Sequence, residues 1–326
     1  MANDRGVRPT RYRRWVPVVA LVALTAVVAG TSGSTASGSA AVAADTQCGS
    51  KYGQTPTSWD HVTVIVFENK TFSQIIGSAN APYLTSLATA CSHATNMNHM
   101  TPTSLTNYIA MTSGYTGHTN GKEVLITGTK PPRIWPQDSV SIFEAMGSGA
   151  REWAESIPSP CAMKNVGDFN VGHTPYQYYT RTATTLCPQY AVPLGSNTGM
   201  SARYNLLIPN EAHDMHGTST LTTSTARIKA GDAWASTFVP TMLASPEYTA
   251  GKSVIILTWD EANAKTTKMP YIVISPYTKA GGTTDVRYDH YSTLKGIQQM
   301  LGVSPLLGHA ADPTVSSIAD DPIFNL

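Results

Sequence analysis

The chain has 326 residues, with 22 Lys and Arg against 21 Asp and Glu and a formal net charge of +1. This balance argues against nucleic acid as a partner, because binding to a phosphate backbone requires a basic face. The length suits one large domain or two small ones.

The first 44 residues are typical of a secretory signal peptide. Five arginines precede an apolar run at 15–29, and a stretch rich in small residues follows and ends at Ala44. The run is shorter than the roughly 20 residues of a membrane-spanning helix. We therefore expect a signal peptide at 1–44, a secreted, extracellular domain at 45–326 and no stable membrane anchor. Removing five arginines and Asp4 leaves 17 basic and 20 acidic residues, a net charge of about −3.

All four cysteines lie in the part expected to be exported, at Cys48, Cys91, Cys161 and Cys187. An oxidising environment favours disulfides, and four cysteines allow three connectivities. We favour Cys48–Cys91 with Cys161–Cys187, since each bond closes a modest local loop. The chain has no C-x-x-C pair, which gives a zinc-knuckle or thioredoxin-like site little support.

Short apolar runs alternate with helical patterns along the rest of the chain. Strands are expected at 62–67, 204–208, 253–259 and 271–275, and helices at 82–91, 107–112, 139–146, 231–244 and 291–301. This alternation predicts an α/β fold with a mostly parallel central sheet flanked by helices. The stretches 113–138 and 156–200, rich in Gly, Pro and Thr, are expected to be long surface loops, which in such domains often carry function.

Polar side chains follow three of the expected strands. In chain order they are Glu68 with Asn69, Asp214 with His216, and Asp260 with Glu261. Ligand sites of open α/β sheets lie beyond the carboxyl ends of the strands, so these side chains are expected at one rim. Several carboxylates at one site repel one another and are costly to bury unpaired. The set therefore predicts one or two divalent metal ions, with His290 as a further imidazole ligand. A helix cap or a solvated turn is the alternative for each residue taken alone.

The segment TPTSLTNYIAMTSG at 101–114 predicts a short helix that begins near Ser104. A hydroxyl there lies at the positive end of the helix dipole, where free backbone N–H groups can hold an anion. Asn107, three residues on, is placed to hold a phosphate oxygen while Ser104 attacks. An ordinary serine N-cap is the alternative. The chain has no G-x-S-x-G elbow, which favours activation of Ser104 by a metal over a hydrolase triad.

Six segments, in order, resemble the signatures of the phosphoesterase family, which contains bacterial acid phosphatases and phospholipases C within the alkaline phosphatase superfamily. They are FENKTF, SLTNYIAMTSG, GHTPYQYY, NEAHDMHG, TWDE and YDHYSTLKGIQQMLG, and the resemblance runs from about residue 61 to 303. The chain is most similar to short, secreted actinobacterial acid phosphatases, including some that act on phosphatidylinositol 3-phosphate. The resemblance implies an alkaline-phosphatase-like fold and hydrolysis of phosphoric esters.

The resemblance also implies roles for single residues. The residues implied to hold a metal are Glu68, Asn69, Ser104, Asp260 and Glu261, with Ser104 also the nucleophile that becomes phosphorylated. A second metal site or a phosphate contact is implied for Asp214, His216 and His290. His173 is implied to reach the phosphoryl oxygens or to protonate the leaving group. The chain departs from the family pattern at Thr106, Gly172 and Lys268, which leaves the number of metal ions and the strength of phosphate binding open. His99 lies outside all six motifs and is expected to be structural.

These features predict a secreted, metal-dependent phosphomonoesterase that forms a phosphoserine at Ser104 and acts on a small phosphoester or a phospholipid head group. The nearest alternative is a phosphodiesterase of the phospholipase C type, although those relatives generally carry added C-terminal domains. A binding protein that has lost activity is a further alternative. A sulfatase is disfavoured, since neither CAMKN nor CPQYA fits the C-x-P-x-R or S-x-P-x-R context of its modified nucleophile.

Overall fold

The computed structural model describes residues 48–128, 132, 135–182 and 186–326. The signal peptide expected at 1–44 lies outside the described residues, as does the start of the expected domain at 45–47. Within the described part of the chain, no helix combines the length and the apolar character needed to cross a membrane.

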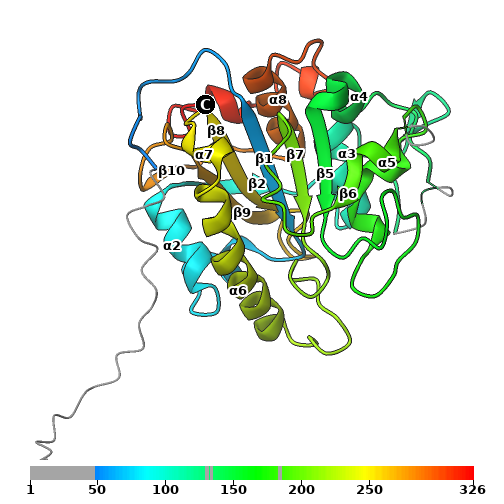
Figure 1. The fold of residues 1–326 in the computed structure, drawn as a ribbon, viewed down its shortest axis with the longest axis horizontal. Coiled ribbons are helices and arrows are strands. Elements are labelled where there is room, and N and C mark those ends of the chain that lie inside the picture. The colour runs from blue at the N-terminus through cyan, green and yellow to red at the C-terminus, as the bar shows by residue number, and fades with distance from the viewer. Residues whose placement is uncertain (1–47, 129–131, 133–134, 183–185) are drawn as a thin grey trace, which may run out of the picture. The chain divides into compact units, whose positions relative to one another are not determined.

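An eight-stranded sheet forms the centre of the fold, in the strand order β10-β2-β9-β8-β1-β7-β5-β6 (Figure 1). Its strands are β1 (His61–Phe67), β2 (Ser92–Asn98), β5 (Ala150–Ala154), β6 (Ala191–Pro193), β7 (Tyr204–Ile208), β8 (Ser253–Trp259), β9 (Lys268–Ile274) and β10 (Gly282–Thr284). Neighbouring strands are parallel except that β9 runs antiparallel to both β2 and β8. The expected α/β fold with a mostly parallel sheet is confirmed.

The three central strands are mostly apolar, as expected for strands that are covered on both faces. Every residue of β7 and β8 is buried, and so is every residue of β1 after His61. Such continuous apolar runs are typical of buried parallel strands. In the register of β1 and β8, His61 lies opposite Ser253 and Phe67 lies opposite Trp259. The two strands therefore end at the same level of the sheet.

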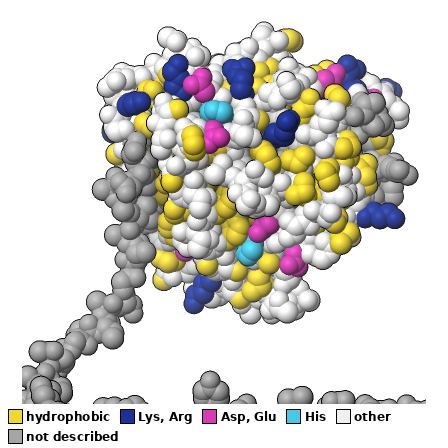
Figure 2. All heavy atoms as spheres, viewed as in Figure 1, with side chains coloured by type: hydrophobic (Ala, Val, Ile, Leu, Met, Phe, Trp, Pro, Cys, Tyr) yellow, Lys and Arg dark blue, Asp and Glu magenta, His cyan; other side chains and the backbone are white. Residues whose placement is uncertain are grey.

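Helices cover both faces of this sheet (Figure 1). On one face α2 (Pro82–Ala90) packs against α6 (Ser224–Leu243), and on the other α3 (Ser104–Ser113) packs against α8 (His290–Leu301). The shorter helices are α1 (Phe72–Ile75), α4 (Ile142–Met146), α5 (Cys187–Tyr190) and α7 (Pro246–Thr249). On the face shown in Figure 2, the described Lys and Arg side chains are scattered among Asp and Glu rather than gathered in one patch.

Both expected disulfides form. Cys48 is bonded to Cys91 across 43 residues, and Cys161 is bonded to Cys187 across 26 residues. The first bond fixes the beginning of the described chain to the end of α2, and the second fixes a surface loop to the start of α5. Each bond restricts the two segments that it joins.

Several elements differ from the sequence-based expectations. The stretch 156–200 is not a simple loop, because α5 and β6 lie within it and β6 extends the sheet beside β5. Similarly, 113–138 contains a small hairpin of β3 (His118–Thr119) and β4 (Lys122–Glu123). The strand expected at 271–275 begins earlier, at Lys268, because it pairs with β2 and β8 on its two sides. Helix α6 begins at Ser224 rather than 231, since the side chain of Thr223 accepts a hydrogen bond from Ala226 N–H and caps an earlier turn.

Strand β5 carries a buried carboxyl group that forms no ion pair among the described residues. Glu152 is fully buried, and its Oε2 accepts a hydrogen bond from Tyr176 N–H at 2.8 Å. Burial raises the pKa of Glu152 to about 8, although this hydrogen bond acts in the opposite direction. An acid whose pKa is raised on folding stabilises the fold fully below its unfolded-state pKa, and this contribution is lost as the pH rises through the folded-state value.

We therefore predict that Glu152→Gln stabilises the protein relative to wild type more at pH 8.5 than at pH 5. The glutamine retains an oxygen that can accept the Tyr176 hydrogen bond but cannot ionise. The difference in melting temperature between variant and wild type, followed from pH 5 to pH 8.5, tests this. A difference that does not change with pH would contradict the raised pKa.

Candidate active site

The ends of β1, β7 and β8 are joined to one another by backbone and side-chain hydrogen bonds. Glu68 N–H donates to the carbonyl of Asp214 at 2.7 Å, and Asp260 N–H donates to the carbonyl of Phe67 at 2.8 Å. Asn69 N–H donates to Asp260 Oδ1 at 3.1 Å. Asn69 has a φ of 57°, in the left-handed region that Asn tolerates better than most residues. This tight turn brings the polar residues after three strands to one rim, as the sequence predicts.

Four carboxyl groups are buried at this rim: Glu68, Asp214, Asp260 and Glu261. Burial raises the pKa of Glu68 well above its usual range, and the charges of Asp260 and Asp214 raise it further. Burial likewise raises the pKa of Asp214 to about 8 and that of Glu261 to about 8, the latter with a contribution from Asp260. The pKa of Asp260 is also raised by burial. When these groups ionise, the rim therefore holds an excess of buried negative charge that protons or a cation would offset.

Helix α3 supplies two hydroxyl groups to Glu68. Ser104 Oγ donates to Glu68 Oε2 at 3.1 Å, and the hydroxyl of Tyr108 donates to Glu68 Oε1 at 2.8 Å. The two residues are four apart in the helix, so their side chains lie on the same face. Ser104 is the first residue of α3, and Thr103 occupies the N-cap position. The serine hydroxyl is thus directed to the carboxylate, which does not support the alternative of an ordinary serine N-cap.

His173 lies among these carboxylates. Its Nε2 is 3.4 Å from Glu68 Oε1 and its Nδ1 is 3.2 Å from Asp214 Oδ2. The second contact has the distance of an ion pair but not the alignment of a hydrogen bond. The ring also stacks on Tyr108, with the centroids 5.8 Å apart. Burial lowers the pKa of His173 to about 4, so the imidazole is neutral at neutral pH in this environment.

His290 and His216 approach the rim from two other elements. His290 is the first residue of α8, and its Nε2 is 2.6 Å from the carbonyl oxygen of Asp260. This carbonyl can only accept, so Nε2 carries the proton and Nδ1 is free to act as an acceptor. His216 N–H donates to Asp214 Oδ1 at 2.7 Å, and its ring lies 5.5 Å from that of His173. His290 is therefore held by the backbone of Asp260, and His216 is held by the carboxyl group of Asp214.

Asn107 has a different environment from the one expected. Its Oδ1 accepts from Met100 N–H at 2.9 Å, and its Nδ2 donates to the carbonyls of Thr101 and Thr103 at 2.7 Å and 3.1 Å. The amide thus holds the loop that precedes Ser104. Contact between Asn107 and a phosphate oxygen stays a prediction, and it would require some of these bonds to open.

Tyr108 and Lys70 also belong to the site, although neither is expected there from the sequence. Lys70 is buried, and its Nζ donates to the carbonyls of Asn69 at 3.0 Å and Met215 at 2.8 Å. Burial lowers the pKa of this ammonium group to about 8. Lys70 thereby ties the turn after β1 to the turn after β7. Lys70 lies in the motif FENKTF and Tyr108 lies in SLTNYIAMTSG. The sequence alone does not show in which direction either side chain points.

The donor atoms at the rim suit a divalent cation. Five side-chain atoms are buried without a hydrogen-bond partner among the described residues, namely Asp214 Oδ2, His216 Nδ1, Asp260 Oδ2, Glu261 Oε2 and His290 Nδ1. Buried polar atoms are normally paired, and oxygen with imidazole nitrogen is a ligand set for divalent metals. In the same described part of the chain, no three His, Cys, Asp or Glu side chains are grouped closely enough to form a metal site as they stand. The residues fit the chemistry of a cation, but their side chains would have to close around it.

Comparison with known proteins gives matches over most of the chain. The model of the Phosphoesterase family matches residues 202–304. A phosphatidylinositol-3-phosphatase from Mycobacterium tuberculosis is 26% identical over 284 residues, which cover 86% of this chain and 89% of that protein.

Solved structures share the fold at low identity. A protein of the alkaline phosphatase superfamily from Vibrio parahaemolyticus aligns with a TM-score of 0.53 and 11% identity, over 79% of this chain and 69% of its own. A Bacteroides thetaiotaomicron protein of glycosaminoglycan metabolism aligns with a TM-score of 0.51 and 11% identity, over 82% of this chain and 77% of its own. These likenesses confirm the expected alkaline-phosphatase-like fold.

We predict that Tyr108→Phe lowers the free energy of unfolding by about 1–3 kcal/mol, because a buried carboxyl group loses a hydrogen bond. Tyr204→Phe is the matched control, since the hydroxyl of Tyr204 is buried without a hydrogen-bond partner among the described residues. Removing that hydroxyl is expected to be neutral or stabilising. Chemical unfolding of both variants measures the two effects, and equal effects would contradict a special role for the Tyr108–Glu68 bond.

Proposed function

We propose that this chain, which belongs to the phosphoesterase family and is a phosphoric ester hydrolase, hydrolyses phosphate monoesters with the help of one or two divalent metal ions. One observation carries the proposal. The hydroxyl of Ser104, at the first residue of a helix, is hydrogen-bonded at 3.1 Å to a carboxylate in a buried acidic cluster. A serine so placed has a partner that fixes its direction and a helix N-terminus that favours an anion.

In the proposed reaction, Ser104 Oγ loses its proton and attacks phosphorus, the P–O bond to the leaving group breaks, the leaving oxygen takes up a proton to become the free alcohol, and a phosphoserine forms. Water then attacks this phosphoserine and releases inorganic phosphate and the free serine. Glu68 orients the Ser104 hydroxyl, and Tyr108 holds Glu68 in turn. The backbone N–H groups in the first turn of α3 have no partner within the helix and are available to the phosphoryl oxygens. Asn107 positions the loop before the nucleophile.

The residues proposed to hold metal are Glu68, Asn69, Ser104, Asp214, His216, Asp260, Glu261 and His290. The support is the set of buried oxygen and nitrogen atoms at this rim that have no hydrogen-bond partner among the described residues. A bound divalent cation would favour the deprotonated serine and offset the charge of the phosphoryl group. His173 lies within 3.4 Å of Glu68 and 3.2 Å of Asp214. The single N–H of its neutral ring suits it to orient one of these carboxyl groups or to donate a hydrogen bond to a phosphoryl oxygen.

Two further parts of the proposal concern substrate and location. A relative that covers most of the chain is a phosphatidylinositol-3-phosphatase, which supports a small phosphoester or a phospholipid head group as substrate. The two disulfides support a secreted protein, because such bonds persist in oxidising environments.

The mature protein is expected to hydrolyse p-nitrophenyl phosphate, and Ser104→Ala is expected to lower the rate by about three orders of magnitude or more, as loss of a nucleophile does in other hydrolases. Ser113→Ala, at the other end of α3, is the matched control and should retain activity.

Chelator should abolish the wild-type activity, and added divalent metal should restore it. Acid quenching followed by mass spectrometry should find phosphate on Ser104.

Full activity in Ser104→Ala would contradict the assignment of Ser104 as the nucleophile. A parallel assay with p-nitrophenyl phosphorylcholine, a diester, distinguishes a phosphomonoesterase from a phosphodiesterase. A strong preference for this diester over the monoester would favour a phosphodiesterase of the phospholipase C type.

A further inference from the structure

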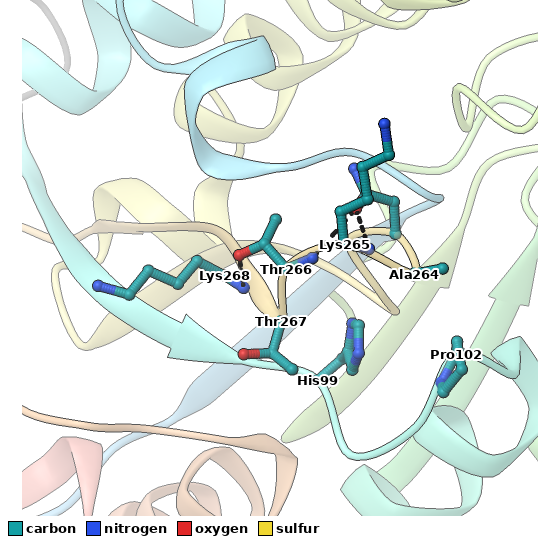
Figure 3. Close-up of a pocket in the computed structure, with 8 residues that line it drawn as sticks. His99, Pro102, Ala264, Lys265, Thr266, Thr267 and Lys268 are labelled. Carbon is teal, nitrogen blue, oxygen red and sulfur yellow. Dashed lines mark hydrogen bonds between the residues drawn. The ribbon is translucent and has the colours of Figure 1, made fainter.

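A pocket of about 410 Å³ lies beside the proposed active site (Figure 3). One wall is formed by His99 and Pro102, in the segment between β2 and α3. The other wall is the connection between β8 and β9, from Asn263 to the first residue of β9, Lys268. These residues of the connection are exposed, so the pocket is open to solvent.

The antiparallel direction of β9 explains why these walls meet. Because β9 runs opposite to β2 and β8, it begins at the rim where those two strands end. Lys268 lies opposite Asn98, the last residue of β2. Thr267 Oγ1 donates to Asn98 Oδ1 at 2.7 Å, and His99 N–H donates to the carbonyl of Thr267 at 3.1 Å. The two walls are therefore tied together by hydrogen bonds.

The same two segments carry proposed active-site residues. Pro102 is two residues before Ser104, and Asn263 is two residues after Glu261. Two residues of extended chain span at most about 7 Å, so the pocket begins next to the nucleophile and the acidic rim. In addition, Ala262 N–H donates to His99 Nδ1 at 2.9 Å, which joins the walls at the side nearer Glu261.

The pocket offers positive charge and hydrogen-bond donors. Lys265 and Lys268 line it, and none of its lining residues is acidic. Within the described part of the chain, neither lysine forms an ion pair with a carboxylate. His99 adds a donor, because its Nδ1 already accepts from Ala262 and its ring proton is then on Nε2. Burial lowers the pKa of His99, which keeps the ring in this neutral form.

This charge is opposite to that of the neighbouring rim, where four carboxyl groups are buried. The transferred phosphoryl group has to lie at that rim, next to Ser104. An anion in the pocket would belong to another part of the substrate, on the side of the leaving alcohol. We propose that the pocket binds a second phosphate group of the substrate, either a monoester or a diester, carried on the leaving alcohol. The proposal rests on the phosphomonoesterase activity proposed above and names its substrate class.

The test compares substrates that differ by one phosphate group. Inositol 3-phosphate has the reacting group alone, whereas glycerophosphoinositol 3-phosphate adds a phosphodiester in soluble form. Wild type should show a higher kcat/KM for the second substrate, mainly through a lower KM. Lys265→Gln and Lys268→Gln should each reduce this preference by about tenfold, the loss expected for one charge-assisted contact. The activity on p-nitrophenyl phosphate should change by less than about twofold, since only a remote contact is lost.

Lys229→Gln is the control, because Lys229 is exposed on α6 and does not line the pocket. It should leave the preference unchanged, and higher salt should weaken the preference of the wild type, since exposed charges are screened. Phosphatidylinositol 3-phosphate in phosphatidylcholine vesicles separates a lipid surface from the phosphate group itself. If kcat/KM rises only for the substrate in vesicles, the proposal is overturned. A similar rise in kcat/KM with soluble glycerophosphoinositol 3-phosphate would support it.

Equal loss of activity on all substrates in the lysine variants would also overturn it, because the lysines would then act on the reaction and not on the second phosphate. An unchanged preference in a variant that combines Lys265→Gln and Lys268→Gln would overturn it while leaving the proposed phosphomonoesterase intact. Absence of monoester hydrolysis by the wild type would instead overturn the proposed function, and this inference with it.

Discussion

The burial of four carboxyl groups at one rim of the sheet is the constraint on which the rest of the site depends. Strands β1 and β8 end in register, and the turn after β7 is bonded to the turn after β1. Glu68, Asp214, Asp260 and Glu261 are therefore brought together out of water, which raises the pKa of each. Uncompensated charges of this kind cost far more than a fold can supply. The four carboxyl groups therefore need protons or a cation, and the side-chain atoms that lack a hydrogen-bond partner among the described residues suit a cation.

The neighbouring side chains act on these carboxyl groups. Tyr108 and Ser104 donate to Glu68, and His173 lies between Glu68 and Asp214. Lys70 joins the turns through backbone carbonyls. Glu68, which we propose holds the metal, thus also positions Ser104, the proposed nucleophile, so loss of one hydrogen bond is expected to affect both stability and catalysis. Beyond the rim, two lysines and a neutral histidine line an open pocket, so the acidic site has a positively charged neighbour.

The sequence predicts strands correctly where both faces of the strand are buried. β1, β7 and β8 are mostly apolar and almost wholly buried, and the polar residues that follow them marked the rim. It was uninformative for β2, SHATNMN, and β5, AREWA, whose polar residues occupy strand positions because tertiary pairing stabilises them. The direction of β9 likewise depends on its partners, and with it the position of Lys268. The local sequence also predicted correctly that Ser104 lies at the start of a helix. It could not show that the side-chain amide of Asn107 is hydrogen-bonded to backbone groups of the preceding loop.

Thermal unfolding of the mature protein with chelator and with saturating divalent metal tests the need for a cation most directly. Metal at about 100 times its dissociation constant should raise the melting temperature of wild type by roughly 5 °C. Asp260→Asn, which removes one buried charge, should be at least as stable as wild type in chelator and should lose most of the response to metal. A wild-type melting temperature that is the same in chelator and in every divalent metal would contradict a cation at this rim.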